Sequence, residues 1–590
     1  METKSAGQAI VDVLRAEGVK HVFGLPGGHV IGIYDALYAT PEITHVLVRH
    51  EQTAASMAAA HAQLTGEPGI CLVTAGPGCT NLLTGIAEAY VGCLPIVILA
   101  GRGATATAER GASQEVPTDQ IFAPVTKWAV RVDRTDLIVD VLRQAFAVAR
   151  AGRPGPVLVD IPRDLLHSDI SVGDYLPVER QARPPGGAAK VAAAAEALAR
   201  AERPLIVAGG GALMSEASEQ VRALAELLAI PVLTTLAGRG TIPDDHLLSA
   251  GGLGAHKTAL SARLLQEADV VLGLGARFEE METNWKPGTV PSPDATYIQV
   301  DIEPAELGRS VPAQIAIVAD VRTLAEQLID ALRDSGISNY LDHPRTFAVA
   351  DEMARLDAEI AQQAAGEEQP MHPLRPIRAI REAFPRETTV AFDVGCLAQH
   401  MAGATPYFKV YEPRSTIVPS SFYGMGFVAA GLPTARLVHP DRPAVCFVGD
   451  GSFQMVMNVL PVAAEYRLGV TWCVLNDGAL GSIRDIQQFA LEDRIIATDF
   501  TVQPDFATIA RACGCHGEHV EDPDGVEAAI ARALEANAQG IPAVLDFVVA
   551  RERVLGTFEH FAIYPDEMVE RARQGAALAE SSSTQQGGKA

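Results

Sequence analysis

The sequence is short of positive charge and of long apolar runs, and each shortage excludes a class of protein. It has 47 Lys and Arg against 72 Asp and Glu, a net charge of −25 that disfavours nucleic acid and anionic membranes as partners. No run approaches the roughly 18 apolar residues that a membrane-spanning helix needs. The N-terminal segment is amphipathic, contains acids and lacks the apolar core of a secretory signal, so we expect a cytoplasmic protein.

Cysteines are few and do not form the pattern of a disulfide framework or a zinc site. Most of the eight lie inside apolar runs. The closest pair, Cys513 and Cys515, lacks the second pair that a zinc site requires. We therefore expect buried, reduced thiols, in agreement with a cytosolic location.

Short apolar runs alternate with Ala/Leu-rich helical stretches from end to end. A chain of 590 residues exceeds a single hydrophobic core, so about three domains are expected. The alternation is typical of parallel strands buried between helices, and the predicted fold class is α/β, with three doubly wound domains on mainly parallel sheets. The predicted strands lie at 21–27, 43–51, 69–78, 94–101, 155–162, 203–212, 230–238, 268–277, 296–304, 387–395, 442–451, 470–477 and 541–550.

Composition also predicts where the domains end. A Pro/Gly-rich polar stretch at 176–190 indicates a linker, and the charged, helical segment 336–375 indicates a long connection. After 553 we expect a tail that forms a lid and then a disordered, low-complexity end. The predicted domains are 1–180 (N-terminal), 190–335 (central) and 375–553 (C-terminal), followed by the tail 554–590.

Oxygen-bearing groups follow two neighbouring predicted strands of the C-terminal domain. Asp450 lies between Gly449 and Gly451, and Asn476 ends the next strand, 26 residues later. Both turns are expected at the C-terminal ends of parallel strands, where α/β sheets bind ligands. The oxygens of Asp450, Asn476 and the Gly478 carbonyl suit Mg²⁺, which takes its other ligands from a diphosphate and water.

The residues around Asp450 favour a phosphate group beside the metal. The glycines allow close approach of the backbone, and a helix beginning at Ser452 is expected to direct its N-terminal N–H groups at the phosphates. An isolated Gly-Asp-Gly is only a tight turn in most proteins. Its combination with an asparagine at this spacing is the specific part of the signal.

These motifs resemble the thiamine-diphosphate-dependent enzymes of the acetohydroxyacid (acetolactate) synthase, 2-hydroxyacyl-CoA lyase and oxalyl-CoA decarboxylase superfamily. The resemblance extends from about residue 5 to 555. It implies thiamine diphosphate and Mg²⁺ as cofactors. The metal ligands would be Asp450, Asn476 and Gly478, and the residues bordering the diphosphate would be Gly449, Gly451 and Ser452.

The same resemblance assigns the catalytic residues. Glu51, in the context Arg49-His50-Glu51-Gln52, would hydrogen-bond N1′ of the aminopyrimidine and exchange a proton there; an ordinary surface glutamate is the alternative. Gln114 and His29 complete the predicted catalytic set. Because Glu51 of one subunit would face the diphosphate-binding domain of another, the resemblance implies at least a homodimer and predicts a homotetramer.

Two further cofactor contacts follow from the resemblance. The carbonyl of Gly424 would accept the 4′-amino group, and Met425 would support the bent cofactor; a plain core methionine is the alternative. In the central domain, the segments 209–211, 254–257, 275–278 and 299–303 resemble a nucleotide site in which Arg277 and Asp301 take part. The expected ligand there is FAD or ADP, and an empty, vestigial domain is the alternative.

The substrate pocket departs from the biosynthetic synthases. Met281, Ile486 and Ser113 stand where those enzymes have arginine, tryptophan and phenylalanine, whereas Gln114 and Lys127 are kept. An arginine holds both oxygens of a carboxylate, so its replacement by Met281 argues against a second free 2-ketoacid and favours an acyl-CoA thioester.

The preferred prediction is therefore a 2-hydroxyacyl-CoA lyase that reversibly splits its substrate into formyl-CoA and a ketone or aldehyde. The alternative is an acetolactate-synthase-like large subunit that condenses pyruvate with a 2-ketoacid. Both would act through a carbanion or enamine on the cofactor. A third hypothesis, a non-catalytic nucleotide-binding homologue, is opposed by the intact Glu51, Asp450 and Asn476.

Overall fold

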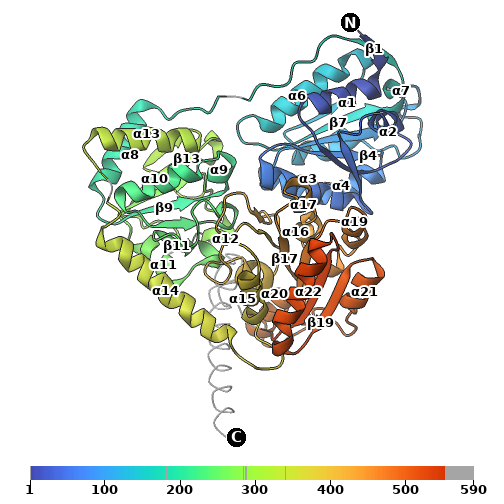
Figure 1. The fold of residues 1–590 in the computed structure, drawn as a ribbon. Coiled ribbons are helices and arrows are strands. Elements are labelled where there is room, and N and C mark those ends of the chain that lie inside the picture. The colour runs from blue at the N-terminus through green and yellow to red at the C-terminus, as the bar shows by residue number, and fades with distance from the viewer. Residues whose placement is uncertain (1, 181, 284, 286–288, 339, 552–590) are drawn as a thin grey trace.

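Three six-stranded sheets follow one another along the chain, and every pair of neighbouring strands within them is parallel. The computed structural model describes residues 2–551 apart from 181, 284, 286–288 and 339. Helices flank each sheet (Figure 1). The predicted α/β class with three doubly wound sheets is confirmed. We name the three parts after their sheets: the first, central and third units.

In the first unit the strand order is β3-β2-β4-β5-β7-β6, and an antiparallel ribbon of β1 with β8 lies beside the sheet. The strands are β1 (Glu2–Ser5), β2 (His21–Leu25), β3 (Thr44–Leu47), β4 (Gly69–Val73), β5 (Ile96–Arg102), β6 (Trp128–Arg131), β7 (Pro156–Pro162) and β8 (Asp169–Val172). The helices are α1 (Ala6–Ala16), α2 (Ile31–Tyr38), α3 (Glu51–Thr65), α4 (Pro77–Val91), α5 (Thr118–Phe122), α6 (Ile138–Arg150) and α7 (Arg163–Leu166).

The third unit repeats this topology. Its order is β16-β15-β17-β18-β20-β19, which is the same as in the first unit when the six strands of each sheet are counted along the chain. The strands are β15 (Thr389–Phe392), β16 (Thr416–Ile417), β17 (Ala444–Gly449), β18 (Thr471–Asn476), β19 (His516–Val520) and β20 (Ala543–Val548). The helices are α15 (Leu374–Ala383), α16 (Phe427–Gly431), α17 (Thr434–Val438), α18 (Asp450–Gln454), α19 (Val459–Glu465), α20 (Gly481–Asp485), α21 (Phe506–Ala512) and α22 (Val526–Ala538).

The central unit has the order β11-β10-β9-β12-β13-β14, in which the chain starts in the middle and winds outward both ways, as in dinucleotide-binding sheets. The strands are β9 (Pro204–Ala208), β10 (Val232–Thr234), β11 (Ser249–Gly252), β12 (Val270–Leu274), β13 (Thr296–Asp301) and β14 (Ile315–Val318). The helices are α8 (Ala188–Arg200), α9 (Gly210–Met214), α10 (Ser218–Leu228), α11 (Ala259–Glu267), α12 (Glu280–Thr283), α13 (Val321–Asp334) and α14 (Pro344–Ala364).

The two predicted connections are found as chain segments of different kinds. The described residues between β8 and α8 contain no helix or strand, whereas α14 occupies much of the 336–375 segment and runs along the outside of the molecule (Figure 1). The domain limits themselves stay a prediction. The predicted tail at 554–590 lies outside the described residues.

The strands that the sequence did not predict, apart from the β1–β8 ribbon, are all sheet edges: β6, β11, β14, β16 and β19. An edge strand has a partner on one side only, so it is shorter or more polar than the runs between two neighbours. Every residue of β6 is half-buried, whereas every residue of β4, β7, β12 and β18 is buried.

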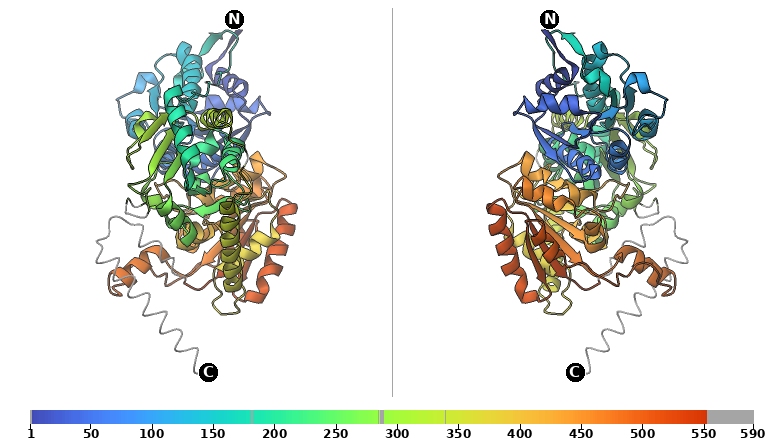
Figure 2. Two further views of the ribbon diagram at one scale, coloured as in Figure 1. Left: turned by 90° about the vertical axis from the view of Figure 1, so that its left-hand side faces the viewer. Right: turned by 90° about the vertical axis from the view of Figure 1, so that its right-hand side faces the viewer.

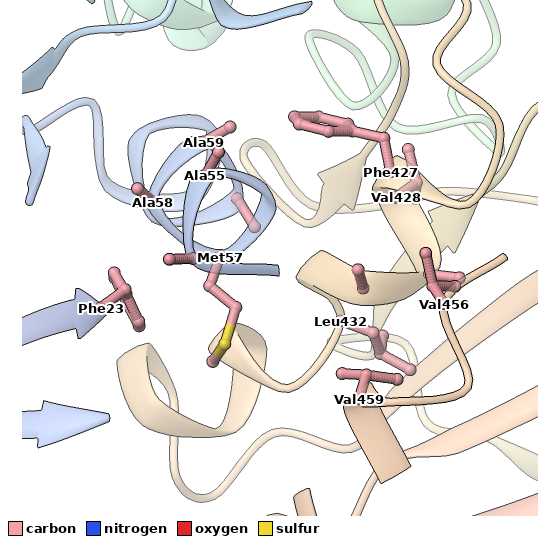
Figure 3. Packing of buried hydrophobic residues seen from close by; sticks show 14 of the residues in the cluster. Phe23, Ala55, Met57, Ala58, Ala59, Phe427, Val428, Leu432, Val456 and Val459 are labelled. Atoms are coloured by element: carbon pink, nitrogen blue, oxygen red, sulfur yellow. The ribbon is translucent and has the colours of Figure 1, made fainter. Parts of the chain in front are cut away.

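The first and third units share one hydrophobic core, formed where α3 packs on α16 and α17. Eleven of the 15 residues of α3 are buried, so this helix lies between its own sheet and the other unit. Its small side chains Ala55 and Ala59 lie nearer to Phe427 and Val428, whereas Ala58 points toward the sheet of its own unit (Figure 3). The two units therefore stack as one block in every view (Figure 2).

Two exclusions made from composition can be compared with the structure. None of the described helices is long and apolar enough to cross a membrane. None of the eight cysteines, which all lie in the described part of the chain, forms a disulfide. Six are buried, but Cys93 and Cys513 are half-buried, so the expectation of buried thiols is wrong for those two.

A buried ion pair anchors the central unit to the third. Arg239 and Asp244 are 2% and 6% exposed, and their side chains are 2.6 Å apart. Arg239 also donates to the carbonyl of Gly403 at 2.7 Å, and the N–H of Val410 donates to Asp244 at 2.7 Å. The two charges therefore neutralise each other, and each also forms a hydrogen bond with the backbone of the third unit.

Removing one member of this pair should be costly. We expect Asp244→Ala to lower the free energy of unfolding by about 3–5 kcal/mol, because it leaves the Arg239 guanidinium buried without its counter-charge. The neighbouring Asp245→Ala is the matched control: its ion pair with Arg386 also joins the two units but is half-exposed, and we expect a loss below about 1 kcal/mol. Equal losses in denaturant unfolding would contradict the assigned role of Asp244.

Candidate active site

The predicted site residues of the outer units lie where neighbouring strands lead the chain in opposite directions. In the first unit this point falls between β2 and β4, whose following loops carry His29 and Thr74. In the third unit it falls between β15 and β17, whose ends carry Asp393 and Asp450. Sheets of this kind leave a crevice at such a point, outside the carboxyl ends of the strands.

Glu51 is the first residue of α3 and is 5% exposed. The side-chain amide of Asn81, on α4, donates to Glu51 Oε2 at 2.9 Å. A Cβ at Gly78 would lie 3.6 Å from Glu51 Oε1 and 2.9 Å from the side chain of Thr74, so glycine leaves the room beside the carboxylate. The buried position of Glu51 argues against the surface-glutamate alternative.

His29 and Gln114 meet through Thr74. His29 Nδ1 lies 3.3 Å from Thr74 Oγ1, and that hydroxyl donates to Gln114 Oε1 at 3.4 Å. Burial, with Arg163 nearby, lowers the pKa of His29, so its ring is neutral at neutral pH. The structure thus brings the three predicted catalytic residues to one end of the first sheet, with Thr74 between them.

Asp450 and Asn476 lie side by side at the ends of β17 and β18, 1% and 7% exposed. The amide nitrogen of Gln503 donates to Asp450 Oδ2 and, at 2.8 Å, to Asn476 Oδ1. One donor reaching both oxygens means that the two point at the same spot, as ligands of one cation must. Burial, with Asp477 adding to it, raises the pKa of Asp450 to about 7.

Gly478 is the third predicted metal ligand, and the predicted start of the neighbouring helix α18 needs correction. Gly478 adopts a left-handed φ of 72°, and its carbonyl accepts the N–H of Phe500 at 2.9 Å, which leaves one lone pair. Helix α18 begins at Asp450 and not at Ser452, because Gly449 is its extended N-cap. Gly451 and Ser452 therefore belong to the first turn of the helix, where N–H groups have no partner within the helix.

Asn476 is oriented by residues that the sequence reading missed. Its amide nitrogen donates to Asp546 Oδ1 at 2.9 Å, and Asp546 Oδ2 lies 2.6 Å from Nδ1 of His519. These contacts turn the amide oxygen toward Asp450. An acid inside an apolar strand was a signal that could have found Asp546; nothing in the sequence singles out Gln503 or Asn81.

Gly424 and Met425 lie in the turn before α16, and both are half-buried. The exposure of Met425 argues against a plain core methionine. Gly426, which follows, has a left-handed φ of 79°, and its N–H donates to Asp393 at 2.9 Å. This hydrogen bond therefore fixes the turn to the end of β15.

A cavity of about 650 Å³ opens at the carboxyl ends of β9 and β12, the corresponding point of the central sheet. A Cβ at Gly211 would lie 2.7 Å from Gly275 Cα, so the two turns pack backbone to backbone. Arg277 lies 3.1 Å from Glu279, and Asp301 accepts the N–H of Glu303. All three units line the cavity, which includes Cys93, Arg153, Arg277, Asp301, Arg414 and Ser420.

The residues that distinguish substrates are dispersed. Ile486 is 6% exposed at the start of a π-helical turn (Ile486–Ala490), and Ser113 is exposed. The amine of Lys127 donates to two carbonyls at the end of α6, those of Val148 at 2.5 Å and Ala151 at 2.6 Å. Met281 belongs to α12, and its side chain lies outside the described residues.

Three protein-family models, one for each domain of the thiamine pyrophosphate enzymes, match the chain. Thiamine pyrophosphate is another name for thiamine diphosphate. The N-terminal TPP binding domain matches residues 4–122, the central domain residues 191–328 and the C-terminal TPP binding domain residues 393–547. The first match contains Glu51, and the third contains Asp450 and Asn476.

Relatives of similar length carry acetolactate synthase names. The probable acetolactate synthase large subunit of Methanocaldococcus jannaschii is 33% identical over 557 residues, which are 92% of this chain and 91% of the relative. The Escherichia coli acetolactate synthase isozyme 3 large subunit is 35% identical over 548 residues, 91% and 93% of the two chains. The acetolactate synthase of Mycobacterium bovis is 34% identical over 568 residues, 94% and 89%.

The arrangement at Asp450 generates a binding prediction. We expect Asp450→Ala to leave the third unit folded and to weaken thiamine diphosphate binding in Mg²⁺ at least about tenfold, because outer contacts of a metal alone contribute that much. Asp524→Ala, an exposed aspartate of the same unit, should bind like the parent. Parent-like affinity of Asp450→Ala in calorimetry would remove this residue from the metal site.

Proposed function

Because the chain belongs to the thiamine pyrophosphate enzyme family, we propose that it forms carbon–carbon bonds as acetolactate synthases do. The reaction would decarboxylate pyruvate or a similar 2-ketoacid and join the remaining acyl unit to the carbonyl of a second 2-ketoacid. The observation that carries this proposal is the similarity to proteins of that name over nine-tenths of the chain. It favours the synthase alternative over the lyase that the sequence reading preferred.

Thiamine diphosphate would bind between two half-sites, the end of the first unit that carries Glu51 and the end of the third unit that carries Asp450. Asp450, Asn476 and the Gly478 carbonyl would hold Mg²⁺, supported by the common direction of the first two oxygens. Gly449, Gly451 and Ser452 would border the diphosphate, and Gly424 and Met425 the aminopyrimidine. When bound, the cofactor would supply both a carbon nucleophile for the substrate carbonyl and a ring that takes up the electron pair released when the carbon–carbon bond breaks. The residues would bind and orient the reactants and transfer protons.

Glu51 would exchange a proton with N1′ of the aminopyrimidine. Asn81 fixes one carboxylate oxygen, which leaves Oε1 toward the space kept open by Gly78. His29 and Gln114, joined through Thr74, would line the side on which substrate enters. The neutral ring of His29 can donate or accept one hydrogen bond without adding charge.

The pairing of half-sites would require two subunits. In this arrangement Glu51 of one chain completes the site built on Asp450 of its partner, so the enzyme would be at least a homodimer with two-fold symmetry. A homotetramer would be a pair of such dimers.

The central cavity would hold an adenine nucleotide, FAD or ADP. Its volume of about 650 Å³ falls in the usual range of ligand sites, about 300–1,000 Å³. The closely packed glycine turns at Gly211 and Gly275 would admit phosphates, and Asp301 lies at a strand end where it can accept a ribose hydroxyl. Arg277, at the same opening, would face the nucleotide.

One set of residues favours a second candidate function, the 2-hydroxyacyl-CoA lyase. Ile486 is buried and apolar, Lys127 is held by two carbonyls, and Met281 replaces an arginine. A second 2-ketoacid would then lack a cation for its carboxylate, and an unpaired buried charge is costly. A thioester carries no such charge at the reacting end.

One assay separates the two candidates. With thiamine diphosphate and Mg²⁺, we expect pyruvate alone to give CO₂ and acetolactate, identified by mass, with no dependence on CoA. The control is the same protein without Mg²⁺. If pyruvate is inert while a short 2-hydroxyacyl-CoA is split to formyl-CoA, the lyase replaces the synthase.

The acid–base role of Glu51 can be measured apart from turnover. Glu51→Gln keeps the size and one hydrogen bond but cannot exchange a proton, so we expect the exchange of the C2 proton of bound cofactor to slow about 10²-fold or more. Binding of the cofactor should persist. Glu42→Gln, a half-exposed glutamate of the same unit, is the control; unchanged exchange in Glu51→Gln would eliminate the assignment.

A further inference from the structure

Two buried carboxylates hold the turn that carries Gly424 and Met425, and they come from different units. Asp393, 0% exposed, lies at the end of β15 and accepts the N–H groups of Gly426 and Ala429, each at 2.9 Å. Glu88, 1% exposed, lies on α4 of the first unit and accepts the N–H of Gly424 at 2.9 Å through Oε2.

Glu88 contacts the start of the turn as well. Its Oε1 accepts the N–H of Ser420, and its backbone carbonyl accepts the Ser420 hydroxyl at 3.2 Å. That hydroxyl in turn accepts the N–H of Phe422 at 3.2 Å. One glutamate of the first unit thus fixes both ends of a five-residue turn in the third unit.

The turn needs such support, because its backbone is strained. Tyr423 adopts a left-handed φ of 56°, which costs a bulky residue free energy and persists only where neighbouring contacts impose it. Burial raises the pKa of Glu88, and hydrogen bonding by Ser420 and Gly424 offsets part of that rise by stabilising the charged form. Side chain and turn therefore depend on each other.

Helix α4, which carries Glu88, is anchored by contacts on both sides of this residue. Asn81, two turns before Glu88 on the same helix, is bonded to Glu51. At the far end of α4, Arg277 of the central unit donates to the carbonyl of Val91 at 3.1 Å. Glu88 lies between these two anchors, so the helix that carries it is held in place independently of the turn.

We propose that Glu88 is a positioning residue for the cofactor. From the first unit, Glu88 sets the position and direction of the Gly424–Met425 segment, which belongs to the third unit. This inference rests on the proposed binding of thiamine diphosphate at that segment. Glu88 would not touch the reacting atoms. It would act through Gly424, whose N–H it holds while the carbonyl of Gly424 faces the aminopyrimidine.

The test uses Glu88→Gln in the full-length protein. The amide keeps one acceptor oxygen but turns an NH₂ group toward the second N–H, so one bond to the turn is lost and replaced by a repulsive contact. We expect thiamine diphosphate, titrated in Mg²⁺ by calorimetry, to bind about tenfold to a hundredfold more weakly, the scale of a lost hydrogen bond to a charged group. Turnover should recover at saturating cofactor.

Tyr466→Phe is the matched control. The Tyr466 hydroxyl accepts the N–H of Leu47 at 2.7 Å and donates to the carbonyl of His45 at 3.0 Å, so it also joins the third unit to the first by two bonds. Neither of these bonds involves the turn. We expect this variant to lower the unfolding temperature and to bind the cofactor like the parent; a merely structural Glu88 would give the same pattern.

A variant on the other side of the contact keeps the test decisive if Glu88→Gln does not fold. A Cβ at Gly424 would lie 3.1 Å from Glu88 Oε2, so Gly424→Ala presses on the same bond. We expect weaker cofactor binding, and in the double variant a loss smaller than the sum of the single losses, as for coupled residues. If the double variant does not fold, Gly424→Ala alone decides by its affinity.

Parent-like affinity in either single variant, or additive losses in the double variant, would overturn the role of Glu88. If the parent itself binds no thiamine diphosphate, the proposed function fails instead, and the two failures remain distinguishable.

Discussion

The molecule depends on one constraint, which is that parallel strands expose all their carboxyl ends at the same edge of a sheet. Where the chain leaves two neighbouring strands in opposite directions, helices cannot close the edge, and a crevice forms. Each of the three sheets has such a point, and each carries polar or glycine-rich turns there: Thr74 and His29, Gly211 and Gly275, Asp393 and Asp450. The candidate site regions of the three units thus share one geometry.

The relative placement of these crevices depends on small side chains. Gly85 faces Ala55 so closely that a Cβ there would lie 2.5 Å from the Ala55 Cβ, and Gly431 approaches the backbone of Ser56. Helices without bulky residues can pack closely, and the core that results is continuous between the first and third units. A rigid contact of this kind allows one unit to orient a turn in the other, as Glu88 does for Gly424.

The sequence predicted what local chemistry determines and missed what tertiary structure determines. The inner strands and the Asp450–Asn476 pair were readable, because strands with two neighbours are continuous apolar runs and the two oxygen-bearing side chains follow such runs. The edge strands β14 and β19 were not: β14 has only four residues, most of them partly exposed, and β19 is mostly polar. Gln503, Asn81 and Glu88 are ordinary polar residues in sequence, and only the fold gives them partners at Asp450, Glu51 and Gly424.

The acidity of the chain would make the proposed cation central to its chemistry. A protein of net charge −25 has little general attraction for a diphosphate, and two of its carboxylates, those of Asp450 and Asp477, lie at the proposed cation site. Burial raises the pKa of both, which means that each carboxylate is unstable as an isolated charge. A divalent cation would stabilise Asp450 and the diphosphate together. The same acids that repel the ligand alone would therefore favour it as a metal complex, so that affinity would come from the cation and the open N–H groups of α18, with no cluster of arginines needed.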